Sequence, residues 1–159
     1  FTGTITDFLA TEFKPNNTTA TAYDITITGS ITGTNLSSTK LKLNTKKIYA
    51  NVDLSLCSMT SIPDNVFKIC TYLTGFTFPD GVNKIEYAAF SGCSNLTSIV
   101  IPDDVAEIGG EAFYNTGITA LSVSGTWTEK NLMNSVVRTS VTLTADILKA
   151  ASSLYYVRE

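Results

Sequence analysis

Residues 78–123 read FPDGVNKIEYAAFSGCSNLTSIV and then IPDDVAEIGGEAFYNTGITALSV, which are two copies of one pattern of 23 residues. Six positions recur at this spacing. They pair Pro79 with Pro102, Asp80 with Asp103, Val82 with Val105, Ile85 with Ile108, Ala89 with Ala112 and Phe90 with Phe113. The later pairs Leu96/Ile118 and Ile99/Leu121 are 22 residues apart, so the second copy lacks one residue near positions 116–117. A fixed period of this length predicts repeat units that stack and pack against their neighbours.

The pattern continues upstream in weaker form. Residues 67–73 (FKICTYL) align with residues 90–96 (FSGCSNL) at the same spacing. The segment 48–56 alternates apolar and polar residues, as a half-buried strand does. The repeats are therefore predicted to extend over residues 48–123, which is roughly three and a half units.

Each unit contains the pattern Leu-x-x-Φ-x-Φ, where Φ is apolar. The alternation predicts a short strand with one buried face, and strands of successive units would pair in parallel at about 4.8 Å. Proline ends two of these strands because it has no N–H to donate. The apolar residues after the proline predict an opposite wall of turns and short helical pieces. The three Φ sets are Leu73/Phe76/Phe78, Leu96/Ile99/Ile101 and Ile118/Leu121/Val123.

The flanking segments are predicted to cap the stack, because the end units of a repeat array otherwise expose apolar surface. The chain is thus one domain, with an N-terminal cap over 1–47, repeats over 48–123 and a C-terminal cap over 124–159. Periodicity and capping residues predict helices and strands in both caps. The expected helices are 7–13, 35–41 (capped by Asn35) and 146–152, and the expected strands are 23–29, 136–143 and 154–157.

Composition excludes several function classes. The net charge is −3 and histidine is absent, so neither a nucleic-acid surface nor a His-based catalytic or metal site is expected. No nucleophile motif, phosphate loop or cofactor fingerprint occurs, so we expect a protein that is not an enzyme and has no cofactor or bound metal. The group Lys40, Lys42, Lys46 and Lys47 is interpreted as a solvated helix face or turn. No apolar run is long enough to span a membrane.

The stretch AFSGCSNLTSIVIPD, residues 89–103, resembles the BspA-like, or Treponema pallidum-type, leucine-rich repeat, whose units read AF-x-x-C-x-x-L-x-x-I-x-I-P. The resemblance is specific over about residues 57–123. It implies an α/β leucine-rich-repeat solenoid, right-handed, with a short parallel β-sheet on its concave face. It also implies a secreted or cell-surface bacterial protein. The array is short, and Thr116 replaces the cysteine of the last unit.

The three cysteines, Cys57, Cys70 and Cys93, are too few and too far apart for a short-spaced zinc site. Cys70 and Cys93 occupy equivalent places in neighbouring units, close enough for a disulfide. The alternative is that both are buried thiols that fill the core as small apolar groups. We expect the thiols, since the resemblance implies a buried free thiol at this position and Cys57 would be left over.

The outward-pointing positions of the strands form the candidate binding surface. These positions are small and uncharged, so they could form a flat binding surface. The alternative is that they carry no function, because short residues of this kind also suit any exposed parallel sheet. The acidic residues that follow the strands, Asp80, Asp103 and Asp104, are a separate candidate site. Repeated carboxylates of this kind could bind calcium, but we expect them to cap the turns after the strands. The concave-face residues are Thr74, Gly75, Thr77, Thr97, Ser98, Val100, Thr119, Ala120 and Ser122.

The resemblance implies adhesion to host matrix or plasma proteins, or to other bacteria, through the repeat surface. We therefore expect a non-enzymatic surface or secreted binding module whose partner is a protein. The alternative is a glycan-binding domain or a purely structural spacer of a larger envelope protein. The chain starts at Phe1 with no initiator Met and shows no signal peptide or lipid-anchor motif, so we expect either a mature fragment or a trimmed form of a longer protein.

Overall fold

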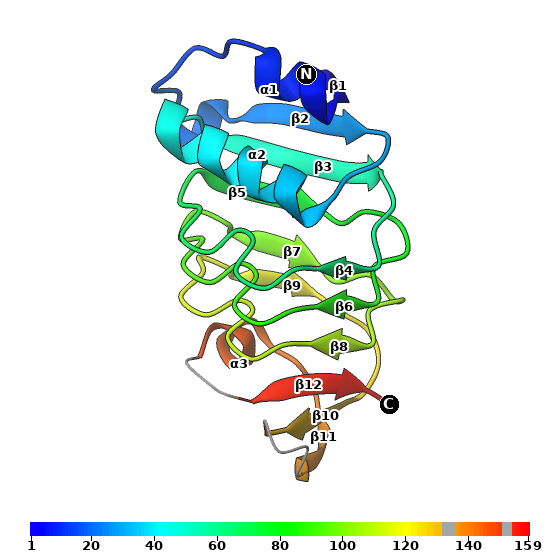
Figure 1. The fold of residues 1–159 in the computed structure, drawn as a ribbon. Helices are drawn as coiled ribbons and strands as arrows, with labels where there is room; N and C mark the ends of the chain where they lie inside the picture. The colour runs from blue at the N-terminus through cyan, green and yellow to red at the C-terminus, as the bar shows by residue number, and fades with distance from the viewer. Residues whose placement is uncertain (132–135, 151–153) are drawn as a thin grey trace.

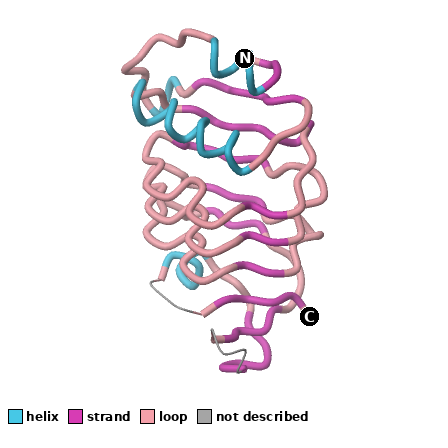
Figure 2. The backbone as a smooth tube through the Cα atoms, in the orientation of Figure 1, coloured by secondary structure: helices cyan, strands magenta, loops and turns pink. Residues whose placement is uncertain are grey.

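The computed structural model describes residues 1–131, 136–150 and 154–159 (Figure 1). Strands lie one above another from the N-terminal to the C-terminal end, in two columns joined by loops (Figures 1 and 2). The predicted mixed α/β class with parallel sheets is confirmed.

The first column contains the strands that the Leu-x-x-Φ-x-Φ pattern predicts. β1 (Thr2–Thr4), β2 (Tyr23–Thr28), β3 (Ala50–Leu56) and β5 (Leu73–Thr77) form a parallel sheet in the order β1-β2-β3-β5. β7 (Ser98–Val100) lies next to β5 and pairs in parallel with β9 (Ala120–Ser122). Ser98 pairs with Ala120, 22 positions on, which confirms the missing residue. The sheet thus continues from the N-terminal segment into the repeats.

The second column was not predicted. β4 (Ser61–Ile62), β6 (Lys84–Ile85) and β8 (Glu107–Ile108) pair in parallel, with equivalent residues 23 positions apart in register. β12 (Tyr155–Arg158), β10 (Trp127–Lys130) and β11 (Val136–Val141) extend this sheet in antiparallel fashion, in the order β11-β10-β12-β8-β6-β4. The sequence predicted only turns and short helical pieces on this wall. That prediction was wrong, because β4, β6 and β8 interrupt the turns.

The turns between the columns use left-handed backbone at two places in every unit. One set is Asn65, Ala88 and Glu111, with φ of 56°, 51° and 55°. The other set is Ile69, Gly92 and Asn115, with φ of 59°, 77° and 52°. Glycine and asparagine suit this conformation, whereas a β-branched residue is strained in it. Ile69 is the only β-branched member of these sets and is therefore the most strained by its backbone.

The described parts of the flanking segments contain three α-helices. α1 (Ile5–Ala10) and α2 (Gly33–Lys46) belong to the N-terminal segment, as does a short 3-10 turn at Thr19–Thr21, and α3 (Ala145–Lys149) lies near the C-terminal end. The predicted capping of α2 by Asn35 was wrong. Thr32 is the N-cap, and Asn35 is the third helical residue, which donates its N–H to Thr32 and accepts the Thr32 N–H on its side-chain oxygen. Such a reciprocal pair satisfies two helix-end donors.

One continuous hydrophobic core runs through the described residues, from Phe8 near the N-terminus to Tyr156 near the C-terminus. Its centre is a ladder of phenylalanines one repeat apart. The Phe90 ring stacks on Phe67 at 5.5 Å and on Phe113 at 5.3 Å between centroids, nearly parallel to both. All three rings are fully buried, and each such burial stabilises the fold by about 1.5–3 kcal/mol. The repeat period therefore sets the spacing of the core itself.

The prediction of buried, unpaired thiols is confirmed. Cys57, Cys70 and Cys93 are all free and buried. The Cys93 thiol lies 3.2 Å from the carbonyl oxygen of Phe67, to which it donates a hydrogen bond. Burial raises the pKa of Cys70 to about 12 and raises the pKa of Cys93 as well. These thiols are core groups and not reactive ones.

Candidate functional site

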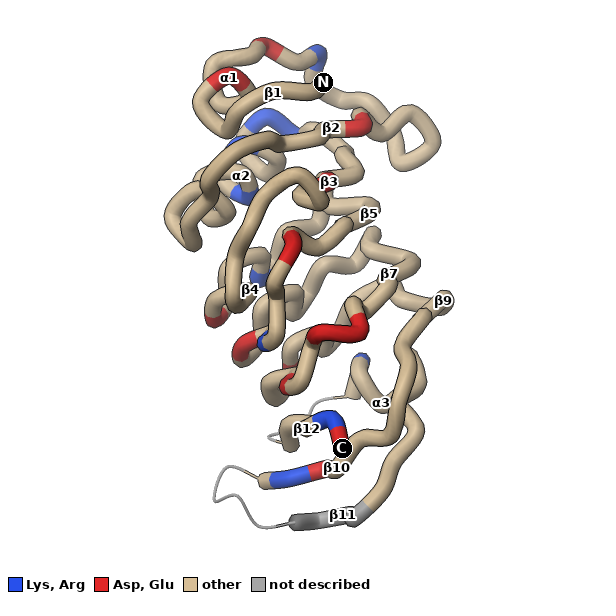
Figure 3. The backbone as a smooth tube through the Cα atoms, turned by 90° about the vertical axis from the view of Figure 1, so that its right-hand side faces the viewer, with Lys and Arg blue, Asp and Glu red and all other residues tan. Residues whose placement is uncertain are grey.

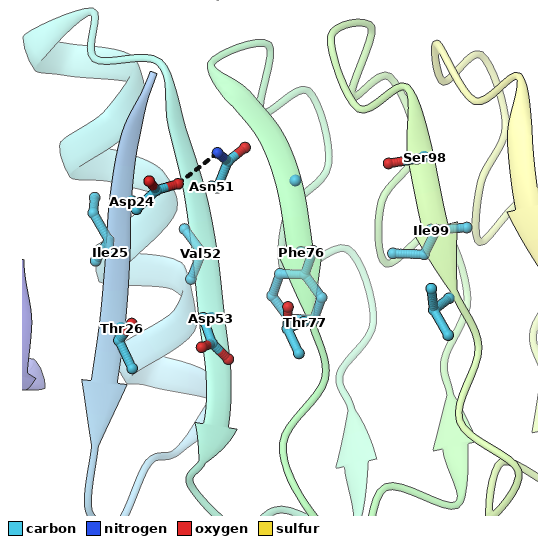
Figure 4. Close-up of a pocket in the computed structure, with 12 residues that line it drawn as sticks. Asp24, Ile25, Thr26, Asn51, Val52, Asp53, Phe76, Thr77, Ser98 and Ile99 are labelled. Carbon is cyan, nitrogen blue, oxygen red and sulfur yellow. Dashed lines mark hydrogen bonds between the residues drawn. The ribbon is translucent and has the colours of Figure 1, made fainter. Parts of the chain in front are cut away.

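The exposed face of the first column holds a shallow hollow of about 430 Å³ (Figure 4). It crosses four neighbouring strands, β2, β3, β5 and β7, and takes three residues from each. We call these twelve residues the sheet hollow. They are Asp24, Ile25, Thr26, Asn51, Val52, Asp53, Gly75, Phe76, Thr77, Ser98, Ile99 and Val100.

Strand alternation decides which side chains reach the surface. Val52, Phe76 and Ile99 are buried and turn toward the core. Their neighbours on either side in the chain therefore point outward, as successive residues of a strand do. Parallel pairing then places these outward side chains in rows across the strands.

One row is joined by hydrogen bonds. Asn51 donates from Nδ2 to Asp24 Oδ1 at 2.8 Å, and the Thr74 hydroxyl donates to Asn51 Oδ1 at 2.8 Å. The carboxylate, amide and hydroxyl thus fix one another across β2, β3 and β5. Polar groups held in this way are ordered before a ligand arrives, which reduces the entropy cost of binding.

Gly75 lets Asn51 keep its position in this row. A Cβ at Gly75 would lie 2.8 Å from Asn51 Oδ1, which is too close. The absence of a side chain lets Asn51 lie over β5. It also leaves the hollow open beside the half-buried Gly75. A glycine at this strand position therefore has a local packing role.

The predicted surface residues fall into three groups. Gly75, Thr77, Ser98 and Val100 line the sheet hollow, and Val100 is 65% exposed. Ser122 lies with Val100 in a neighbouring hollow over β7 and β9. The other four lie outside both hollows: Thr74 is half-buried beside Asn51, and Thr97, Thr119 and Ala120 are exposed. Whether any of the nine binds a partner stays a prediction.

Four polar residues of the hollow were missed by sequence reasoning. They are Asp24, Thr26, Asn51 and Asp53, all on β2 and β3. The signal was available, since the segments 23–28 and 50–56 both alternate apolar and polar residues. Residues 1–47 were interpreted as a cap only, so β2 was not considered as part of the same exposed face.

The hollow offers hydrogen-bond acceptors on an apolar floor and carries negative charge. Its lining contains two carboxylates, Asp24 and Asp53, and no lysine or arginine. Asp53 Oδ1 accepts the N–H of Ser55 at 2.9 Å. Among the residues that the structure describes, no group of three or more His, Cys, Asp or Glu side chains could hold a metal ion. The arrangement suits recognition of a surface ligand.

Comparison with known proteins bears out the resemblance seen in the sequence. Residues 60–134 match the family model of the BspA type leucine rich repeat region (6 copies). Neither the curated proteins nor the solved structures contain a match to the chain. Repeats of this kind are typical of surface and protein-binding modules. Within the described parts of the chain, no helix has both the length and the apolar character needed to cross a membrane.

Proposed function

We propose that this chain is a non-enzymatic binding module of a secreted or cell-surface bacterial protein, and that it adheres to a host matrix or plasma protein or to other bacteria. The observation that carries the proposal is the sheet hollow, where ordered polar side chains surround an apolar floor on an exposed parallel sheet. The match of residues 60–134 to the BspA-type repeats supports it.

The proposal includes the architecture. The repeats form a leucine-rich-repeat solenoid, with the first column as its concave sheet and with residues 1–47 and 124–159 as caps on the repeats over 48–123. Equivalent residues one repeat apart pair in both columns, which supports this interpretation. A surface of this kind recognises a partner along its length and not in a deep pocket.

A binding experiment tests the proposal. The chain is passed over immobilised collagen, laminin and fibrinogen and over whole bacterial cells, and retention is measured. The variant carrying Thr77→Glu, Ser98→Glu and Ser122→Glu places charge on the exposed sheet. We expect it to lose retention, because a buried unpaired charge opposes binding.

The matched control introduces the same charge elsewhere. Thr34→Glu, Ser37→Glu and Ser94→Glu alter three exposed hydroxyl residues on α2 and in a turn. We expect this variant to be retained like the unmodified chain. Equal retention of both triple variants would refute the sheet as the binding face, and retention on a glycan array alone would favour the glycan-binding alternative.

A further inference from the structure

A second hollow, of about 270 Å³, lies on the second column, where β8 runs between β6 and β12. Its lining consists of two tyrosines, two glycines and three carboxylates. These seven residues, which we call the tyrosine hollow, are Asp64, Glu86, Tyr87, Glu107, Gly109, Gly110 and Tyr155. It is separate from the sheet hollow, with which it shares no residue.

Two glycines line this hollow, and Gly109 lets the backbone of the neighbouring unit approach closely. A Cβ at Gly109 would lie 2.7 Å from the backbone carbon of Glu86 and from the backbone nitrogen of Tyr87, so no larger residue fits without a shift. Gly110 lies 23 residues after Tyr87, so it occupies in its own unit the position that Tyr87 occupies in the preceding unit. The next unit thus has a gap at the place where a second tyrosine would stack.

Tyr87 is held in place at both ends. Its hydroxyl donates to Glu111 Oε2 at 3.0 Å, and its backbone N–H donates to Asp64 Oδ1 at 2.9 Å. The residue is nevertheless 42% exposed. Tyr155 stands on the other side of the glycines, because the register of β12 on β8 pairs its neighbour Tyr156 with Ile108. An exposed ring that is already ordered is the kind of group that anchors protein interfaces.

The surroundings of the hollow are strongly acidic. Lys84 lies 3.0 Å from Glu86 and 3.1 Å from Glu107, so one lysine serves two carboxylates. Residues 49–125 contain eight carboxylates against two lysines, a net charge of −6, whereas the whole chain carries −3. Figure 3 shows acidic positions spread along the middle of the stack, with few basic ones among them.

We propose that the tyrosine hollow is a docking site for a basic side chain, lysine or arginine, of a protein partner. A cation over a tyrosine ring is attracted by the negative face of the ring, and flanking carboxylates add to this attraction. The hollow has room for a single side chain and is rimmed by Asp64, Glu86 and Glu107. The proposal concerns a different face from the sheet hollow and does not depend on it.

A titration followed by ¹⁵N–¹H NMR tests the site. The probes are a capped hexa-arginine peptide, a capped Gly-Ser peptide of equal length and N-acetylglucosamine. We expect hexa-arginine to shift the amide signals of Gly109 and Gly110 in 50 mM salt and to bind several-fold more weakly in 500 mM salt, since salt screens exposed charges. The proposal is overturned if these signals do not move, or if the neutral peptide or the sugar moves them equally.

Two pairs of variants separate the hollow from general charge. Tyr87→Ala should weaken hexa-arginine binding about two- to fivefold, the range of an exposed cation–π contact, whereas Tyr114→Ala alters another exposed tyrosine and should have no effect. Asp64→Asn removes a negative charge but keeps an oxygen that accepts the Tyr87 N–H, and it should weaken hexa-arginine binding. Its control is Asp146→Asn on α3, which removes a charge far from the hollow in sequence and should leave binding unchanged. Equal effects within either pair would overturn the proposal. Tyr87→Phe, which keeps the ring, should retain binding even where Tyr87→Ala disturbs the fold.

Discussion

The guanidinium carbon of Arg158 lies 4.5 Å from the ring centroid of Trp127, and this pair joins β12 to β10 near the C-terminal end of the stack. Trp127 is fully buried and donates from its indole nitrogen to the carbonyl oxygen of Ser124 at 3.1 Å. Arg158 donates to the same oxygen at 2.7 Å and to the Val105 carbonyl oxygen at 2.8 Å. One side chain on β12 therefore ties this strand to the segments that follow β7 and β9.

Replacing Arg158 with lysine should destabilise the protein by about 2 kcal/mol, because a charged donor is lost from several carbonyl oxygens at once. Lysine keeps the charge but has a single nitrogen. It therefore lacks the planar guanidinium group, whose three nitrogens donate to several carbonyl oxygens at once. Urea unfolding measures the effect as a lower midpoint at unchanged slope. The control Lys68→Met, on an exposed turn, should stay within about 0.5 kcal/mol. A loss in Arg158→Lys no larger than in the control would contradict this role for Arg158.

Ile69→Asn should stabilise the protein by about 0.5–1 kcal/mol. Ile69 has φ of 59° and is 61% exposed, so it has backbone strain and little burial to offset it. Asn115 occupies the same place two units later with φ of 52°, which shows that asparagine fits this turn. The measurement is the midpoint of thermal unfolding.

Leu41→Asn is the matched control for this change. Leu41 is 62% exposed but lies within α2, where the backbone is right-handed. The Leu41→Asn variant should gain no stability, and it should lose a few tenths of a kcal/mol because asparagine has a lower helix propensity than leucine. A gain in both variants would mean that removal of exposed apolar surface, and not relief of strain at Ile69, explains the effect.

The first column and the phenylalanine ladder could be predicted because their residues recur at a fixed period and alternate over several positions. The second column could not. Each of β4, β6 and β8 offers a single buried isoleucine in a strand of two residues, which gives no alternation to detect. The sheet hollow was half predicted for a related reason. Thr77 and Ser98 come from the repeats, whereas Asp24 comes from a segment outside them, and only pairing between strands distant in sequence brings these residues together.

Phe90→Ala should destabilise the protein by about 3–5 kcal/mol, because it leaves a cavity between two stacked rings. The ring of Phe90 lies between those of Phe67 and Phe113, so the change separates the units on either side. Tyr114→Ala removes a ring that is 38% exposed and should cost less than half as much. Calorimetry or urea unfolding compares the two. Similar losses would show that the ladder is no more important than a surface ring.

The buried thiols should make stability fall as pH rises above about 9. Burial raises the pKa of Cys70 from 9.0 to about 12, and it raises the pKa of Cys93 as well, so the folded protein keeps protons that the unfolded chain releases. The unfolded state then binds fewer protons, and the free energy of unfolding decreases by up to about 1.4 kcal/mol per pH unit for each thiol. Lys84 does not explain a loss of stability in this range. Its hydrogen bonds to Glu86 and Glu107 raise its pKa from 10.5, so its contribution to the free energy of unfolding is kept below pH 10.5. Urea unfolding between pH 9 and 10 measures the slope, and the Cys70→Ala/Cys93→Ala double variant should flatten it. An equally steep slope in the double variant would show that other groups cause the alkaline loss.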